Sequence, residues 1–158
     1  MEKSTPVNPN PCFQHSTQIR LCIHFWEWRG DFLTEPYFNI SHNGETFILK
    51  VWGEFWGNWP KEKYKGIDFN ADATKPTLEK ALDGVCDAWS AFGVKGKSGC
   101  HCGDHVGGGD IWWNVSIPFS SNEELVGSEF SKKLRDSLVK LAESFAILLP
   151  YRVSTNSK

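Results

Sequence analysis

The spacing of hydrophobic residues changes along the chain, and each spacing predicts a different element. In IRLCIHFWEW, residues 19–28, apolar side chains occupy every second position from Ile19 to Phe25. A period of two is typical of a strand with one buried face, so a strand is predicted there. Prolines at positions 6, 9 and 11 precede it and block regular backbone pairing. Residues 1–17 are therefore expected to form a flexible lead-in.

A β-hairpin is the clearest local prediction. In residues 37–52, YFNISHNGETFILKVW, Asn43-Gly44 separates two β-rich runs. Both central residues of a type I′ turn need positive φ, and Asn-Gly suits that turn. The second arm is apolar on both faces, as in a central strand. A short strand at 66–70 and a longer one at 111–119, IWWNVSIPF, are predicted further along the chain.

Two segments have helical spacing instead. Residues 76–92, PTLEKALDGVCDAWSAF, place apolar residues three and four apart, with a proline in the first turn and Gly93 after the end. A second amphipathic helix is predicted behind the capping-box pattern of residues 121–124 and runs to about Leu149, before Pro150. Residues 151–158 are expected to form a polar tail.

The predicted order of elements is β-β-β-(β)-α-β-α, which indicates an α+β fold. We expect a largely antiparallel sheet of about four to five strands, with two amphipathic helices packed on one face, in a single domain spanning residues 18–150. The opposite face of the sheet would carry exposed aromatic residues.

Composition narrows the function classes. The net charge of −2 argues against a strongly basic nucleic-acid binder, because phosphate contacts need an excess of Lys and Arg. Five cysteines are an odd number for a closed disulfide framework, which favours free thiols in a reducing compartment. The polar N-terminus lacks a signal-peptide core, and no run reaches the ~18 apolar residues of a membrane span. A soluble, cytoplasmic protein is therefore expected.

Residues 91–98, AFGVKGKS, match a loose phosphate-loop pattern. A phosphate loop lies between a strand and a helix, whose N-terminal amides hold the phosphates. The segment before this motif is predicted to be helical, and the glycine-rich segment after it cannot begin a helix. Nucleotide binding is therefore disfavoured.

The residues that follow include a candidate metal site. Cys100, Cys102 and His105 offer sulfur and nitrogen ligands of the kind that zinc prefers. Strong zinc modules bring two separated ligand pairs, whereas this chain has one cluster, so incidental thiols in a loop are the competing interpretation. No other cofactor is expected.

The segment 93–109 holds seven glycines in seventeen residues and is predicted to be a long loop. Structureless loops of that length are uncommon and are often functional. A lid or a partner-binding loop is the resulting hypothesis.

Aromatic residues form the strongest functional signal, with eight Trp and eleven Phe in 158 residues. Because Trp112 and Trp113 are neighbours on a strand, they must point to opposite faces. Aromatic residues with a few charges are typical of protein interface hot spots. The residues expected at a binding surface are Trp26, Trp28, Trp52, Trp56, Trp59, Trp112, Trp113, Asp104 and Asp110.

These patterns favour a small, non-enzymatic binding protein that engages a protein partner, of an inhibitor or immunity type, through an aromatic sheet face and the glycine-rich loop. The acidic residues near the tryptophans favour a basic partner. One alternative is a zinc-binding module or metal-dependent enzyme that uses the Cys100–His105 cluster. Another is a reader of modified bases or single-stranded nucleic acid that stacks bases on exposed tryptophans.

Overall fold

The computed structural model describes residues 36–120 and 128–156. The predicted lead-in and the predicted strand at 19–28, with Trp26 and Trp28, lie outside these residues. So does the capping-box pattern at 121–124.

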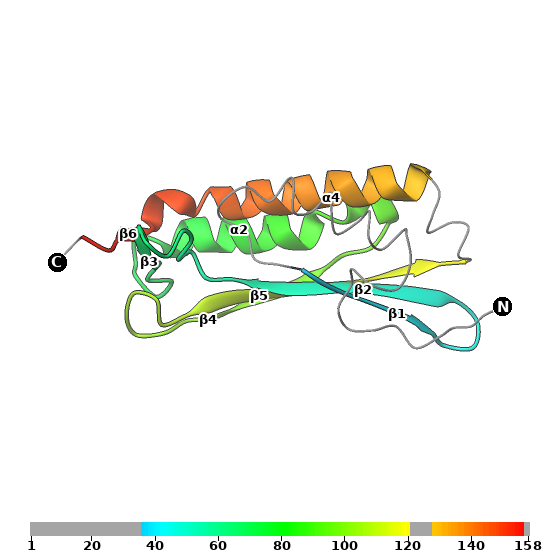
Figure 1. The fold of residues 1–158 in the computed structure, drawn as a ribbon, viewed down its shortest axis with the longest axis horizontal. Helices are drawn as coiled ribbons and strands as arrows, with labels where there is room; N and C mark the ends of the chain where they lie inside the picture. Colours follow the sequence, from blue (N-terminus) through cyan, green and yellow to red (C-terminus); the bar gives the residue numbers. More distant parts are fainter. Residues whose placement is uncertain (1–35, 121–127, 157–158) are drawn as a thin grey trace.

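An antiparallel sheet of four strands forms one layer of the fold (Figure 1). In order across the sheet, its strands are β1 (Tyr37–His42), β2 (Phe47–Phe55), β5 (Asp110–Phe119) and β4 (Lys97–His101). A second, two-stranded sheet pairs β3 (Tyr64–Gly66) with β6 (Val153–Ser154). The strands lie antiparallel in both sheets.

In the part of the chain that the structure describes, two helices form the other layer. α2 (Lys75–Asp87) and α4 (Ser128–Ala146) lie on the same side of the four-stranded sheet, as Figure 1 shows. Short 3₁₀ turns, η1 (Ser90–Phe92) and η2 (Leu149–Tyr151), follow them. The α+β prediction, with an antiparallel sheet and two helices on one face, is confirmed. Neither described helix is both long and apolar enough to cross a membrane.

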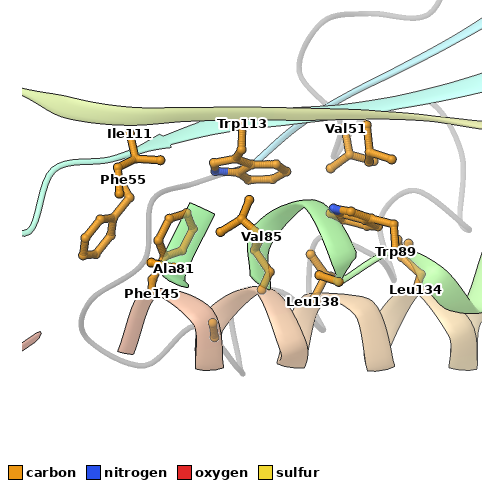
Figure 2. Close-up of a cluster of buried hydrophobic side chains, with 14 of the residues drawn as sticks. Val51, Phe55, Ala81, Val85, Trp89, Ile111, Trp113, Leu134, Leu138 and Phe145 are labelled. Carbon is orange, nitrogen blue, oxygen red and sulfur yellow. The ribbon is translucent and has the colours of Figure 1, made fainter. Parts of the chain in front are cut away.

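The core lies between the two layers because successive side chains along each strand point to opposite faces of the sheet. On β5 the odd-numbered residues from Ile111 to Phe119 are buried, while the even-numbered residues from Trp112 onward are half-buried or exposed. Trp113 lies among α2 and α4 side chains (Figure 2) and stacks on Trp89, with ring centroids 6.1 Å apart. The ring of Phe55 on β2 stacks on the ring of Phe145 on α4, with the ring centroids 4.6 Å apart.

Gly84 lets the two helices approach each other closely. A Cβ atom at this position would meet the Oγ atom of Ser144 on α4. The glycine in the middle of α2, which weakens a helix intrinsically, therefore has a packing role.

The predicted hairpin is present, but its turn differs from the prediction. Asn43 has a negative φ, whereas Gly44 has a φ of 95°, so the turn is not type I′. Four residues connect β1 to β2, because His42 pairs with Phe47. The Asn43 side chain accepts hydrogen bonds from the backbone N–H groups of Glu45 and Thr46, at 3.0 and 2.9 Å. Asn43 thus stabilises the loop through its side chain rather than through a left-handed backbone.

In the second sheet, one strand lies earlier than predicted and the other was not predicted. The strand predicted at 66–70 lies earlier, at β3, because Asp68 begins a turn by accepting the N–H of Asn70 at 3.0 Å. The predicted polar tail contains β6, whose pairing with β3 is extended by a hydrogen bond from the N–H of Thr155 to the carbonyl of Lys63, at 2.8 Å. A two-residue strand is too short to produce a periodic pattern.

The boundaries of the helices also differ from the predicted ones. The predicted helix at 76–92 divides into α2 and η1, and η1 ends at Gly93 as predicted, with a left-handed φ of 72°. The second helix, predicted to reach about Leu149, ends at Ala146.

Candidate functional site

One row of side chains crosses all four strands of the larger sheet. Tyr37, Trp52, Asn114 and Lys97 are direct cross-strand partners on β1, β2, β5 and β4. Their chain neighbours, such as Trp113, point into the core, so the row lies on the face opposite α2 and α4. We call this the outer face, and these four residues the cross-sheet row.

Aromatic contacts fix the row at the β1 edge. The rings of Tyr37 and Trp52 stack with centroids 5.7 Å apart and planes 26° from parallel. Tyr37 is 47% exposed and Trp52 is half-buried. The Nζ atom of Lys50 lies 5.6 Å from the centroid of the Trp52 ring, within the range of a cation–π interaction. The stack therefore presents a flat apolar surface with a positive charge beside it.

Trp112 extends the aromatic surface toward the other edge. It pairs with Gly99 on β4 and with Glu54 on β2. Its indole lies so close over Gly99 that an added Cβ atom there would be 2.6 Å from Cζ2 of the ring. Only glycine fits beneath this indole without a shift.

A histidine–carboxylate pair lies beyond Trp112. Nδ1 of His101 is 2.9 Å from Oδ1 of Asp110, its cross-strand partner. Asp110 is 4% exposed, whereas most of the His101 side chain is open to solvent. The second carboxylate oxygen, Oδ2, is buried without a hydrogen-bond partner in the described part of the chain. The pair fixes the orientation of the imidazole at the margin of the outer face.

Trp56 and Trp59 lie on the connection from β2 to β3 and are 42% and 37% exposed. Gly57, with a φ of 74°, packs this loop directly against the buried Ile67 side chain. The guanidinium of Arg152 donates a hydrogen bond to the carbonyl of Trp59 at 2.9 Å. Two exposed indoles are thus held on a constrained loop.

Trp113 does not belong to the predicted binding surface. It is 1% exposed and stacks on Trp89 in the core. The alternation rule correctly placed Trp112 and Trp113 on opposite faces, but it did not identify which of the two faced the helices. Trp113 is therefore a core residue.

The segment predicted to be a long loop is a hairpin. Residues 97–101 form β4, which pairs with β5, and only residues 102–109 connect the two strands. An added Cβ atom at Gly103 would collide with the backbone of Gly108, and one at Gly66 would lie 2.8 Å from Cα of Gly107. The glycines serve close backbone packing, which contradicts an open loop across 93–109. Asp104 is exposed on this connection.

The phosphate-loop pattern has a different structural role. The Ser98 hydroxyl lies 3.3 Å from the carbonyl of Leu82 and 3.4 Å from Sγ of Cys86, so it ties β4 to α2. The last two residues of the motif, Lys97 and Ser98, begin strand β4, so a strand stands where a phosphate loop has a helix. It has no helix N-terminus to hold a phosphate, as expected.

The predicted zinc ligands have contrasting surroundings. Cys100 is half-buried against the core, whereas Cys102 and His105 are exposed. Burial raises the pKa of Cys100 to about 12, with further contributions from the side-chain hydrogen bond and charge of Cys102 and from the charge of Asp110. A raised pKa disfavours the thiolate that binds metal. Within residues 36–120 and 128–156, no three His, Cys, Asp or Glu side chains form a group that could hold a metal ion.

The sequence reasoning missed Tyr37 and Asn114. Only the cross-strand register could have identified these two residues, and that register depends on the length of the hairpin loop.

Comparisons with family models, with curated proteins and with solved structures found no match for this chain.

Proposed function

We propose that this protein is a non-enzymatic binding protein that engages a protein partner through the outer face of its sheet. The observation that carries the proposal is the cross-sheet row, with Tyr37 stacked on Trp52. Rigid aromatic rings supply a large contact area at a low entropic cost, and they dominate binding energy at protein interfaces. Trp112 beside the row widens the same aromatic surface.

The polar residues of the outer face also favour a protein partner. The Asn114 side chain lies within the row and offers both hydrogen-bond donors and an acceptor, which matches exposed peptide groups. An aromatic centre with polar groups around it is the usual composition of a protein interface.

The charges of the outer face and of the whole chain favour a protein partner over a nucleic-acid partner. The outer face carries Lys50 and Lys97 together with Glu54, and the whole chain has a net charge of −2. Binding to a phosphate backbone depends on several cations that act together. Two lysines beside a carboxylate are a weak basis for such binding, although base stacking on Trp52 and Trp112 remains the alternative to test.

The test is affinity capture from a native host lysate, with and without nuclease treatment, followed by binding measurements on the purified partner. The test variant is the double substitution Tyr37→Ala/Trp52→Ala. The control is Lys140→Ala/Glu143→Ala, on the helical face of the molecule. Loss of a hot spot costs about 2 kcal/mol, so we expect the test variant to bind about thirty-fold more weakly and the control to bind normally.

Two results would contradict the proposal. Equal binding by the test variant and the wild type would exclude the row as the interface, provided that circular dichroism shows both to be folded. Capture that disappears after nuclease treatment would favour the nucleic-acid alternative. Elemental analysis of the same purified protein tests the zinc alternative, because stoichiometric zinc that is lost in Cys102→Ser would support it.

A further inference from the structure

One end of the molecule carries exposed indoles beside exposed lysines. Trp56 and Trp59, which are 42% and 37% exposed, lie on the connection from β2 to β3, and the exposed Lys61 and Lys63 follow on the same connection. This connection leads into the small sheet of β3 and β6, at the left end of the molecule in Figure 1. We call these four residues, together with Arg152, the basic–aromatic end.

Arg152 and a tight turn fix the backbone of this end. The guanidinium of Arg152 lies 3.7 Å from the centroid of the Tyr64 ring, while Nη1 donates to the carbonyl of Trp59. The N–H of Lys63 donates to the carbonyl of Pro60 at 3.0 Å, which closes the turn before β3. Because the backbone that carries the indoles and lysines is already ordered, a ligand that binds them pays a smaller entropic cost.

The charge of this end is opposite in sign to that of the rest of the chain. Residues 56–66 and 152–154 contain four cations and one carboxylate, which are Lys61, Lys63, Lys65, Arg152 and Glu62. Their formal charge of +3 leaves −5 on the remaining residues, since the whole chain has a net charge of −2. An anionic surface therefore attracts this end of the molecule and repels the remainder, which orients the molecule as it approaches.

We propose that the basic–aromatic end docks on a membrane surface that contains anionic phospholipids. Tryptophan is enriched at the boundary between lipid headgroups and hydrocarbon, because its ring is apolar and its N–H is polar. Lysine and arginine beside such a ring are attracted to anionic headgroups. The inference is independent of the proposed binding function, because the basic–aromatic end shares no residue with the cross-sheet row.

The number of cations favours a lipid surface over a nucleic acid. Each lysine or arginine near an anionic bilayer strengthens binding by about fivefold. A few cations beside an apolar anchor are therefore enough for reversible binding to a membrane. Nucleic-acid binding depends on more phosphate contacts acting together along a strand. The two indoles supply the apolar anchor here.

The experiment measures co-sedimentation of the full-length protein with vesicles of two compositions. One is phosphatidylcholine mixed about three to one with phosphatidylserine, and the other is phosphatidylcholine alone. We expect the protein to bind the first at least about tenfold more tightly than the second, because only the first is anionic. Added salt should weaken this binding, since it screens the attraction between the lysines and the headgroups.

Two variants test the cations and the indole separately. Lys61→Ala/Lys63→Ala should bind the anionic vesicles about twenty-five-fold more weakly. Trp56→Ala should bind them at least about fivefold more weakly, because it removes apolar surface that enters the headgroup region. Circular dichroism verifies the fold of each variant. If Trp56→Ala unfolds, the lysine variant still tests the proposal, since both of its side chains are exposed.

Two further variants are matched controls. Lys80→Ala/Lys140→Ala removes the same charge from exposed lysines on α2 and α4, so normal vesicle binding is expected. Tyr37→Ala/Trp52→Ala, the variant that tests the proposed binding function, should also bind vesicles normally. Failure of either proposal can thus be distinguished from failure of the other.

Four results would overturn the membrane proposal. The first is equal binding to the two kinds of vesicle, and the second is a loss in Lys80→Ala/Lys140→Ala as large as that in Lys61→Ala/Lys63→Ala. The third is a loss of vesicle binding in Tyr37→Ala/Trp52→Ala, which would place the contact on the outer face. The fourth is binding of a single-stranded oligonucleotide, measured by fluorescence anisotropy, that is tighter than vesicle binding and depends on Trp56 and the two lysines.

Discussion

The contact between Trp112 and Gly99 makes a quantitative prediction about the outer face. A Cβ atom added by Gly99→Ala would lie 2.6, 2.8 and 2.9 Å from the Cζ2, Cε2 and Nε1 atoms of the indole. Carbon atoms in contact prefer a separation of about 3.5–4.0 Å. The indole must therefore lift away from β4, or β4 must move away from β5.

Two opposing terms set the size of the effect. Overpacking costs about 1–3 kcal/mol, whereas replacing a strand glycine with alanine otherwise stabilises a protein by about 0.5–1 kcal/mol. We expect Gly99→Ala to lower the free energy of unfolding by about 1 kcal/mol in the wild type. In a Trp112→Ala background the clash is absent, so Gly99→Ala should raise the free energy of unfolding by about 0.5 kcal/mol.

The assay is a double-mutant cycle measured by urea unfolding of the four proteins. The cycle should give a coupling energy of about 1–3 kcal/mol between Gly99 and Trp112. The tryptophan emission of Gly99→Ala should also shift to longer wavelength, because the displaced indole becomes more exposed to water. A Gly99→Ala cost that is identical in both backgrounds would refute the reasoning, since the indole would then not be its cause.

Three other predictions concern the helices, the second sheet and the thiols. Gly84→Ala should lower thermal stability despite the better helix propensity of alanine, and Ser144→Gly should relieve the cost, because the new methyl group meets that side chain. Arg152→Ala should destabilise the protein by about 1 kcal/mol and speed amide hydrogen exchange around Trp59, because it removes a hydrogen bond to that carbonyl; unchanged exchange would contradict this. Because the pKa of Cys100 is raised from 9.0 to about 12, its contribution to stability is complete below pH 9 and is lost as the pH rises toward 12. Unfolding curves of wild type and Cys100→Ala should therefore differ in their pH dependence only above about pH 9, and parallel curves there would contradict the assignment.

The sequence predicted the layers of the fold because they follow from long periodic segments. The alternation in β5 and the helical spacing in α2 each extend over ten or more residues. Strand β4 was missed because its five residues, KSGCH, contain a glycine and no strong β-former. Only its pairing with β5 makes it a strand, and pairing between segments is not visible in local composition.

Prediction of the candidate site depended more on the pairing register of the strands than on the hydrophobic pattern of the sequence. A two-residue turn at Asn43-Gly44 would have paired His42 with Glu45 and placed Tyr37 opposite Lys50. The four-residue loop pairs Tyr37 with Trp52 instead. The side chain of Asn43 accepts hydrogen bonds from two amides of the loop and so stabilises the observed register. A shift of two residues keeps every side chain on its face, so hydrophobic alternation alone could not distinguish them.

The pairing of β3 with β6 has a consequence for the order of folding. The hydrogen bond from Arg152 to Trp59 and the one from Thr155 to Glu62 each join residues 93 positions apart. During synthesis on the ribosome, the hairpin of β1 and β2 emerges and can form early, since its contacts are local. The loop carrying Trp56 and Trp59 reaches its final geometry only when residues 152–155 have been made and have docked. A deletion that removes these residues should leave the four-stranded sheet intact but release that loop, so a fusion partner is better attached at the other end of the chain.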